Sequence, residues 1–186
     1  MTDLELIARI RAGEEAAFLA FYRAQHESLW RFLYHLEHNE GEARDLFQET
    51  WLRATKLLLS ATPIRNPRAL LFQIAANCRR DHLRRKQVRR LFFLPAKKPE
   101  QKGEPFTQIA APQMQTDSAA FELEERLAKA LRRLPQIQRQ VFLLKEWEGF
   151  SLAEIAELLA IPVGTVKSRL HHAVRFLREE LRELRE

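Results

Sequence analysis

The chain of 186 residues is long enough for one medium-sized domain or two small ones. Hydrophobic residues make up 46% of it and charged residues 30%, and with only five glycines this composition favours helices over a sheet protein. The formal net charge of +6 favours an acidic partner such as nucleic acid, although a charge that only aids solubility would give the same total.

Cysteine content and hydropathy indicate in which cellular compartment the protein is expected. Cys78 is the only cysteine, which excludes an internal disulfide and a multi-cysteine metal site. The first residues lack the cationic start and apolar core of a signal peptide, and the apolar runs are far too short to span a bilayer. We therefore expect a cytoplasmic protein without membrane insertion.

Helical periodicity predicts three helices in the N-terminal part. Asp3 can cap a short first helix that ends at Gly13, with Leu4, Ile7 and Ile10 turned inward. Aromatic residues and leucines at helical spacing from Glu14 onward predict a longer second helix with a core-facing side. A break at 39–41 precedes a third helix over about 42–59.

Prolines between Ser60 and Pro67 predict a loop, and a fourth helix follows from Pro67. The C-terminal half of this helix, from Arg79 to Arg90, holds seven Arg or Lys and one Asp, a local charge of +6. Such a helix end commonly complements the helix dipole on a solvated face. Here neighbouring like charges repel by roughly a few tenths of a kcal/mol each, so a polyanion that relieves the repulsion is the favoured explanation.

Periodicity is lost over 91–116, where prolines recur. This stretch is interpreted as a flexible linker between domains at 1–90 and 117–186, although its apolar start, Leu91–Leu94, is expected to dock on the domain or on a partner. Helical periodicity resumes from Asp117 and stops at Pro135, and a further helix is predicted from Gln136 to Trp147. The predicted fold is all-α, with two small helical domains, the second a four-helix unit.

The last two helices of the second domain are predicted to form a helix-turn-helix. Ser151 and Glu154 make a capping box that starts a short helix. The turn falls near Ala160, and Pro162 suits the first position of the next helix, where its missing N–H costs nothing. That helix has an apolar stripe from Val166 onward and a polar, cationic opposite face, which is typical of a DNA-reading helix-turn-helix.

Five segments together resemble a known family: Asp45–Ala54, Asn66–Asn77, Asp81–Arg85, Leu134–Phe142 and Ile155–His171. In this order and spacing they are similar to the extracytoplasmic-function bacterial sigma factors, the small two-domain promoter-specificity subunits of RNA polymerase. The resemblance covers almost the whole chain except the linker. Two residues depart from the family pattern, which usually has Gly in place of Ala160 and often Trp in place of Leu70. If Ala160 must adopt a left-handed conformation, it costs roughly 1 kcal/mol there.

The resemblance implies an RNA polymerase sigma factor, which binds core polymerase and directs promoter recognition, DNA melting and transcription initiation at a specific set of promoters. One helical face would bind the clamp helices of the largest polymerase subunit, although spacing alone favours a salt-bridged solvent face. Trp147 and Phe150 either pack internally or meet the flap of the second-largest subunit. An anti-sigma partner is also implied. The expected clamp-binding residues are Asp45, Gln48, Glu49 and Arg53.

By the same resemblance, the loop at 60–66 and the helix after it would capture and melt the minus-ten promoter element. Opening DNA requires a pocket for an unstacked base and cations along the separated strand. For Asn77, a hydrogen bond to a base edge and a local bond to the backbone are equally open. Phe72 and Trp51 are interpreted as core residues. The expected minus-ten contacts are Arg65, Asn66, Asn77, Arg80, Arg84 and Arg85.

The helix after Pro162 would read the minus-thirty-five element in the major groove, with base contacts from its N-terminal half. Its adjacent histidines suggest a metal only weakly, since no Cys or carboxylate lies at ligand spacing. We expect no metal and no other cofactor. The expected minus-thirty-five contacts are Lys167, Ser168, Arg169, His171, His172 and Arg175.

Two other functional classes compete with a sigma factor. A stand-alone helix-turn-helix regulator would need a dimerisation surface and would leave the basic fourth helix and the Asp45 face without a task. An enzyme would need paired carboxylates, a nucleophile–base pair or a phosphate-cradling glycine loop, and the sequence has none of these. We therefore expect no enzymatic activity and no small-molecule substrate, and Cys78 is interpreted as a packed free thiol.

Overall fold

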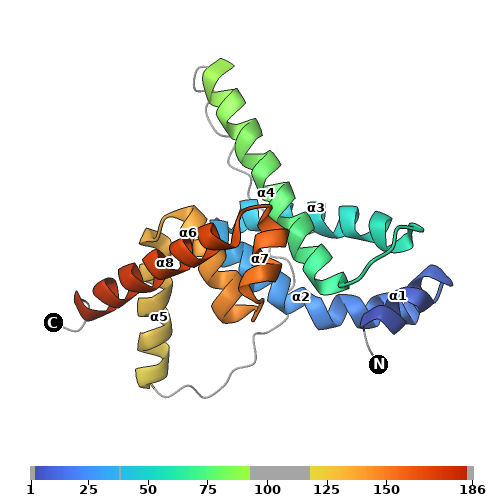
Figure 1. Ribbon diagram of the computed structural model, residues 1–186, viewed down its shortest axis with the longest axis horizontal. Coiled ribbons are helices and arrows are strands. Elements are labelled where there is room, and N and C mark those ends of the chain that lie inside the picture. Colours follow the sequence, from blue (N-terminus) through green and yellow to red (C-terminus); the bar gives the residue numbers. More distant parts are fainter. Residues whose placement is uncertain (1–2, 38, 93–117, 184–186) are drawn as a thin grey trace.

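The computed structural model describes residues 3–37, 39–92 and 118–183, and within these ranges the chain is helical and forms no β-strand (Figure 1). None of the helices in these ranges is long and apolar enough to cross a membrane. The all-α prediction is confirmed. The elements are α1 (Asp3–Arg11), α2 (Glu15–Glu37), α3 (Glu40–Leu59), α4 (Pro67–Phe92), α5 (Ser118–Arg133), α6 (Gln136–Phe142), a π-helical turn η1 (Leu143–Trp147), α7 (Leu152–Leu159) and α8 (Val163–Glu183).

The first unit, α1–α4, encloses a core that α2 lines with aromatic and leucine side chains. Phe21 and Phe72 are fully buried. Trp51 of α3 packs edge-on against Phe21, with ring centroids 6.2 Å apart. Trp51 and Phe72 are therefore core residues, as predicted.

Two details of the first unit differ from the prediction. Ile7 and Ile10 are buried as predicted, but Leu4 is half exposed and Leu6 is buried in its place. The break before α3 is also shorter than predicted. Asn39 caps this helix directly, since its Oδ1 accepts a hydrogen bond from the backbone N–H of Glu42 at 3.0 Å.

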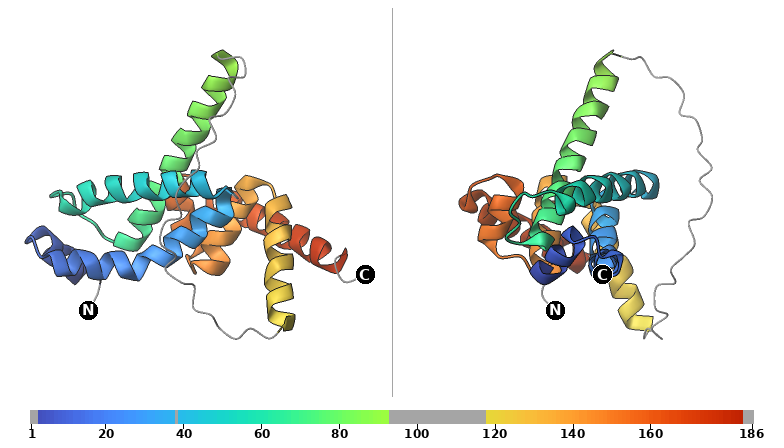
Figure 2. Two further views of the ribbon diagram at one scale, coloured as in Figure 1. Left: turned by 180° about the vertical axis from the view of Figure 1, so that it is seen from behind. Right: turned by 90° about the vertical axis from the view of Figure 1, so that its right-hand side faces the viewer.

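The C-terminal half of α4 projects from the body of the molecule, as Figure 2 shows from two sides. The helix continues to Phe92, so the predicted domain boundary at 90 falls inside it. Leu91, expected to dock, is 80% exposed on this helix. The rest of the predicted linker, with Leu94, lies outside the described residues.

The second unit, α5–α8, packs α5, α6 and α7 against α8. Val141 and Ile155 are fully buried in its core. The single helix predicted from Gln136 to Trp147 is wrong in one respect, because its last turn, Leu143–Trp147, is π-helical. The π-helical turn ends before Gly149, whose φ of 71° lies in the left-handed region that glycine adopts without strain. Apolar spacing does not distinguish a π turn from an α turn over so few residues.

The predicted helix-turn-helix is confirmed in α7 and α8. Ser151 Oγ accepts a hydrogen bond from Glu154 N at 3.2 Å, and Ser151 N donates one to Glu154 Oε2 at 2.8 Å, which closes the capping box. Ala160 has φ 53° and ψ 49°, so the left-handed turn expected there is formed by alanine. α8 starts at Val163, directly after Pro162 rather than at it.

The two units lie against each other. α7 packs on α4, and α2 contacts both α5 and α6. The rings of Phe72 and Phe150 are 5.3 Å apart, and those of His35 and Trp147 are 4.6 Å apart. Phe150 and Trp147, which the sequence left between internal packing and a polymerase contact, thus pack against the first unit in this structure.

Candidate nucleic-acid interface

The outer face of α8 brings together the residues predicted to read upstream promoter DNA. Val166, Ala173 and Leu177 are buried on the opposite side and fix the rotation of the helix. Arg169 is half-buried at the edge of the outer face. The exposed residues of this outer face are Lys167, Ser168, His171, His172 and Arg175.

Arg175 has one weak partner on this face. Its Nε lies 3.7 Å from Glu179 Oε1, and both side chains are about two-thirds exposed. An ion pair this exposed contributes about 0–1 kcal/mol, so a phosphate can replace the carboxylate at little cost. The rings of His171 and His172 are 5.8 Å apart, and among the described residues no group of three or more His, Cys, Asp or Glu is placed to hold a metal ion.

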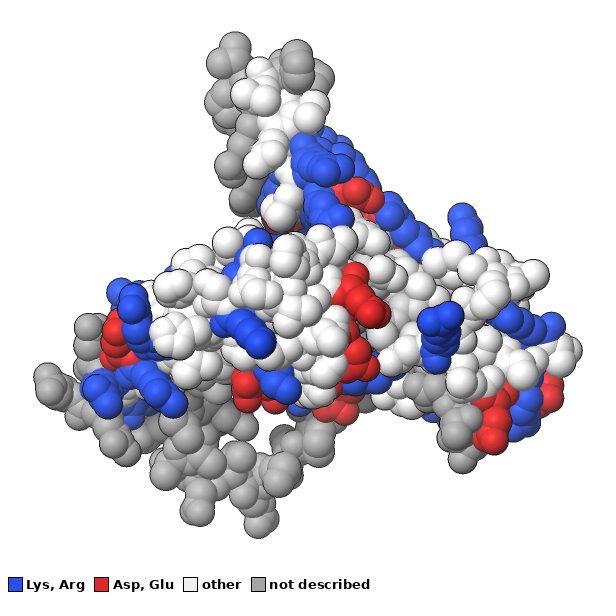
Figure 3. All heavy atoms as spheres, in the orientation of Figure 1, with Lys and Arg blue, Asp and Glu red and all other residues white. Residues whose placement is uncertain are grey.

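The projecting half of α4 carries a cationic ridge, which we define as Arg80, Arg84, Arg85 and Arg89. All four side chains are exposed. Figure 3 shows Lys and Arg side chains gathered along this part of α4. No carboxylate within the described ranges pairs with Arg84, which leaves its guanidinium available to an anion.

Part of the charge repulsion on α4 is relieved within the chain. Arg79 is buried and pairs with the equally buried Glu37 of α2, so it is a structural cation. Lys86 Nζ lies 2.5 Å from Glu42 Oε1 of α3. The excess charge of this segment is therefore smaller at the surface than the sequence count suggests.

The cysteine of α4 has no chemical role in this surface. Cys78 is fully buried and free. Burial raises the pKa of its thiol, so the unreactive protonated form is favoured. The prediction of a packed free thiol is confirmed.

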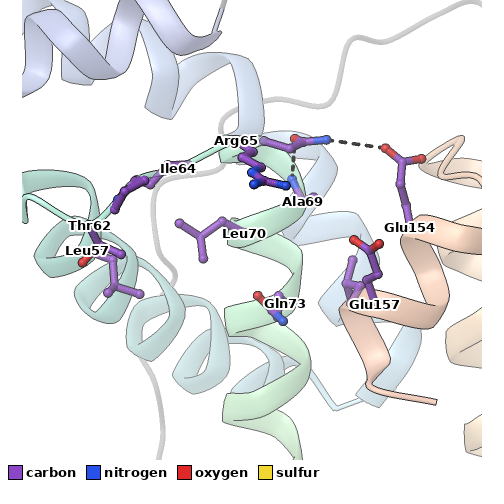
Figure 4. A pocket seen from close by; sticks show the side chains of 12 residues that line it. Leu57, Thr62, Ile64, Arg65, Ala69, Leu70, Gln73, Glu154 and Glu157 are labelled. Atoms are coloured by element: carbon purple, nitrogen blue, oxygen red, sulfur yellow. Dashed lines mark hydrogen bonds between the residues drawn. The ribbon is translucent and has the colours of Figure 1, made fainter.

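A pocket of about 400 Å³ lies between the 60–66 loop, α4 and α7 (Figure 4). Asn66 helps to shape it, because its Oδ1 accepts a hydrogen bond from Ala69 N at 2.9 Å and so caps α4. Asn66 Nδ2 also lies 3.5 Å from Glu154 Oε1. The lining residues are Leu57, Thr62, Pro63, Ile64, Arg65, Asn66, Ala69, Leu70, Gln73, Glu154, Glu157 and Leu158.

Asn77 and Arg80 lie further along α4. Asn77 is half-buried, and its side chain hydrogen-bonds to no described residue, so the local backbone bond left open by the sequence is not formed. Arg80 Nη2 donates a long hydrogen bond of 3.5 Å to the backbone oxygen of Leu159. Both side chains are thus weakly held by the protein.

Only part of the predicted polymerase-binding face of α3 is open to solvent. Asp45 and Gln48 are exposed, as expected. Glu49 and Arg53 instead turn toward α4, where Arg53 lies 2.5 Å from Glu49 and 3.0 Å from Asp81. The solvent-exposed part of the face is therefore narrower than the sequence predicted.

Sequence reasoning missed two apolar residues on the exposed side of α3. Leu52 is 66% exposed and Leu59 is 58% exposed. Leu52 lies one turn after Gln48 and therefore on the same face. The sequence could have indicated that Leu52 is exposed, because it lies outside the buried stripe of Leu46, Thr50 and Ala54.

Two helical units that each carry a cationic face, the second built as a helix-turn-helix, define a two-part DNA-binding protein. Family models agree with this division. The model of Sigma-70 region 2 matches residues 21–89, and that of Sigma-70 region 4 matches residues 124–177.

Curated relatives and solved structures identify the family. The chain is 32% identical over 181 residues to the ECF RNA polymerase sigma factor SigW of Bacillus subtilis, with 96% of each chain covered. It is 36% identical over 175 residues to SigL of Mycobacterium tuberculosis, with 93% of each covered. This chain belongs to the ECF RNA polymerase sigma factors. It is a promoter-specificity factor for transcription initiation.

Two solved structures share the fold across both units. The sigma factor RpoE, in complex with the anti-sigma factor NepR from Bartonella quintana, has a TM-score of 0.64 at 26% identity and covers 89% of this chain and 96% of its own. CnrH, in complex with the cytosolic domain of CnrY, has a TM-score of 0.67 at 25% identity and covers 97% of each chain. The stand-alone regulator considered from the sequence is thereby excluded.

Proposed function

We propose that the two units divide the work of initiation along the promoter. The unit at 1–90 binds core polymerase and opens the minus-ten element, and the unit at 117–186 reads the minus-thirty-five element, with 91–116 as the linker. The observation that carries this proposal is that each unit has a cationic face of its own, one on α4 and one on α8. Both faces can neutralise phosphates of the same duplex.

On α8, the N-terminal half reads bases and the next turn binds phosphate. Lys167, Ser168 and His171 are exposed near the N-terminus, which a recognition helix points into the major groove. Arg169 and His172 flank them at the edge of the face. Arg175, one turn on, is placed for the backbone and can release Glu179 to reach it.

On the first unit, the side of the pocket formed by the 60–66 loop and α4 takes an unstacked base, and the cationic ridge follows the separated strand. Asn66 and Arg65 line the pocket and are both exposed. Asn77 offers an unpaired amide to a base edge. Arg80, Arg84 and Arg85 neutralise the phosphates beyond it.

The exposed side of α3 is the contact with the clamp helices of the largest polymerase subunit. Asp45 and Gln48 supply polar contacts, and Leu52 supplies an exposed apolar anchor between them and the end of the helix. Glu49 and Arg53 support the face through their ion pair. The flap of the second-largest subunit is the expected contact of the second unit.

An anti-sigma protein is a further expected partner, since the solved relative RpoE is in complex with the anti-sigma factor NepR. The chain carries out these tasks by binding alone, without catalysis or a small-molecule substrate. Its site of action is the cytoplasm, where it meets polymerase and the chromosome.

Run-off transcription tests this proposal. Core polymerase is incubated with a pool of genomic fragments, with and without the chain, and specific starts are expected only in its presence. Lys167→Ala with His171→Ala should change which promoters are used, whereas Arg178→Ala, exposed further along α8, should not. Equal loss at all promoters in the Lys167/His171 variant would contradict base reading by α8.

A further inference from the structure

The loop between α3 and α4 is held near both of its ends. At the α4 end, Asn66 Oδ1 accepts the hydrogen bond from Ala69 N that caps the helix. Nearer α3, the backbone oxygen of Thr62 accepts a hydrogen bond of 2.5 Å from Nη2 of Arg11, the last residue of α1. Residues 63–65 between these points form no hydrogen bond with any described residue, so the two anchors define the path of the loop.

Arg11 also joins the loop to the end of α3. Its Nε donates a hydrogen bond of 3.1 Å to the backbone oxygen of Leu58, one of the last four carbonyls of α3, which have no partner inside the helix. Both donors belong to one planar guanidinium, so a single side chain fixes the separation of Leu58 and Thr62. A lysine at this position would offer only one ammonium on a flexible stem.

α1 gives Arg11 a rigid support. Ile7 and Ile10 are buried, and the helix contacts α2, α3 and α4. It is closed by Gly13, which has φ 86° and donates its N–H to the backbone oxygen of Ile10 at 3.0 Å. The guanidinium therefore extends from a helix end that three other helices hold in place, as a precisely positioned side chain requires.

The anchored loop forms one wall of the pocket. Thr62, Ile64 and Arg65 all line it, with Ile64 half-buried and Arg65 exposed (Figure 4). Pro63 has a fixed φ and restricts Thr62 to extended backbone, so the path set at Thr62 is carried on to Ile64. A displacement of the Thr62 oxygen would therefore move the side chains that line the pocket.

We propose that Arg11 is a positioning residue for promoter opening, which holds the loop wall in the shape that accepts one unstacked base and rejects the others. This role rests on the proposed function of the pocket. It also gives a task to α1, which precedes the segment matched by the region 2 model, residues 21–89. Because Arg11 acts through Thr62, its loss should reduce discrimination between bases more than it reduces DNA binding.

The first test measures the loop in the free chain, without polymerase or DNA. Amide nitrogen relaxation gives the backbone order parameters of Thr62, Ile64 and Arg65. They should be about 0.85 in the unsubstituted chain and below about 0.6 in Arg11→Ala. Arg23→Ala removes the same charge from an exposed position of α2 and should leave them unchanged. Unchanged order parameters in Arg11→Ala, or an equal fall in Arg23→Ala, would show that Arg11 does not hold the loop.

The second test measures base choice in the holoenzyme, on a promoter found by run-off transcription and altered to each other base at every minus-ten position. Permanganate reactivity reports melting and nuclease protection reports upstream binding. At the captured position the unsubstituted chain should prefer one base by about tenfold. Arg11→Ala should reduce this preference to about threefold or less with upstream protection intact, and Arg23→Ala should alter neither signal. An unchanged preference in Arg11→Ala, or a salt-dependent loss that is equal for all bases, as a phosphate contact gives, would overturn the proposal.

Arg11→Lys separates the geometry of the guanidinium from its charge. It keeps the charge but cannot bond both backbone oxygens in the same way, so the order parameters and the base preference should both fall toward those of Arg11→Ala. Full recovery of both by lysine would show that charge alone is sufficient, and that Arg11 does not position the loop.

A variant of the pocket itself distinguishes failure of this inference from failure of the proposed function. If Ile64→Ala with Arg65→Ala keeps the base preference, the loop does not capture the base, and the proposed function of the pocket is refuted together with the role of Arg11 in base choice. The order parameters still decide whether Arg11 holds the loop. If the pocket variant loses the preference and Arg11→Ala keeps it, only the inference about Arg11 is refuted.

Discussion

At Ala160 the backbone takes a conformation that alanine disfavours. This residue joins the two helices of the helix-turn-helix with φ 53°, and its backbone N–H reaches back to Ala156 and Glu157 at the end of α7. The left-handed region brings the Cβ of any L-residue too close to the following carbonyl oxygen. The turn is therefore formed against a local preference, and α7 and α8 hold it by their packing.

Replacing Ala160 with glycine should stabilise the chain. Without a Cβ the strain disappears, and the free energy of unfolding in urea should rise by about 1 kcal/mol. Ala153→Gly is the matched control, since Ala153 is exposed in the right-handed part of α7. It should lower the same free energy by about 0.5–1 kcal/mol. The same sign for both variants would contradict a strained turn.

His35 makes the contact between the units sensitive to acid. Its ring packs edge-on against Trp147, and burial together with the charges of Arg31, Arg132 and Arg139 lowers its pKa from 6.5 to about 4. A depressed pKa means that the folded state favours the neutral ring. The contribution of the neutral His35 ring to the stability of the folded chain is fully present above about pH 6.5 and is lost as the pH falls toward 4.

His35→Phe should remove this dependence and keep the aromatic contact. The unsubstituted chain should lose on the order of 1–3 kcal/mol more stability than His35→Phe when the pH falls from 6.5 to 4. Urea unfolding at a series of pH values measures the difference, in which the carboxylates common to both chains cancel. Parallel pH profiles would show that the pKa of His35 is the same in the folded and unfolded states.

At the scale of single elements, α3 gives the most direct test of polymerase binding. Leu52→Asp should weaken binding of the chain to core polymerase about tenfold or more, because it places a charge where an apolar anchor is expected. Leu4→Asp, at another exposed leucine, is the matched control and should leave the affinity unchanged. Titration of labelled chain with core polymerase measures both. Equal affinity of Leu52→Asp and the unsubstituted chain would remove α3 from the clamp contact.

Local features of these elements could be predicted from the sequence because they depend on neighbouring residues. The capping box of Ser151 and Glu154, and the buried stripe of α3, follow from spacings of three or four residues. The π turn at Leu143 escaped prediction, since the apolar spacing is the same for both helix types. Glu49 and Arg53 were expected on an open face, but Arg53 pairs with Asp81 and Glu49 with Arg85, both on α4.

At the scale of the whole molecule, the contact between the units was beyond sequence reasoning. Phe72 was recognised as core, but nothing in its local spacing indicates that Phe150 of the other unit covers it. Glu148 has the sequence context of an ordinary exposed glutamate. Only the fold brings it to Arg68, because that pairing joins segments on either side of the linker. The family resemblance supplied the function, and the structure supplied the arrangement of its surfaces.

The division of labour between the two units is the central claim, and it predicts that melting and upstream binding can be separated. In the holoenzyme, Arg84→Ala with Arg85→Ala removes two phosphate contacts from the cationic ridge and leaves α8 intact. Upstream DNA should remain bound in this variant, but the strand separation that needs the ridge should be lost.

Footprinting of the holoenzyme on one promoter measures both steps, with nuclease protection for upstream binding and permanganate reactivity of unpaired thymines for melting. The unsubstituted chain should give protection at minus thirty-five and reactive thymines at minus ten. The Arg84/Arg85 variant should keep the protection and lose the reactivity. Loss of both signals together, or full reactivity in the variant, would contradict the assignment of melting to α4 and of anchoring to α8.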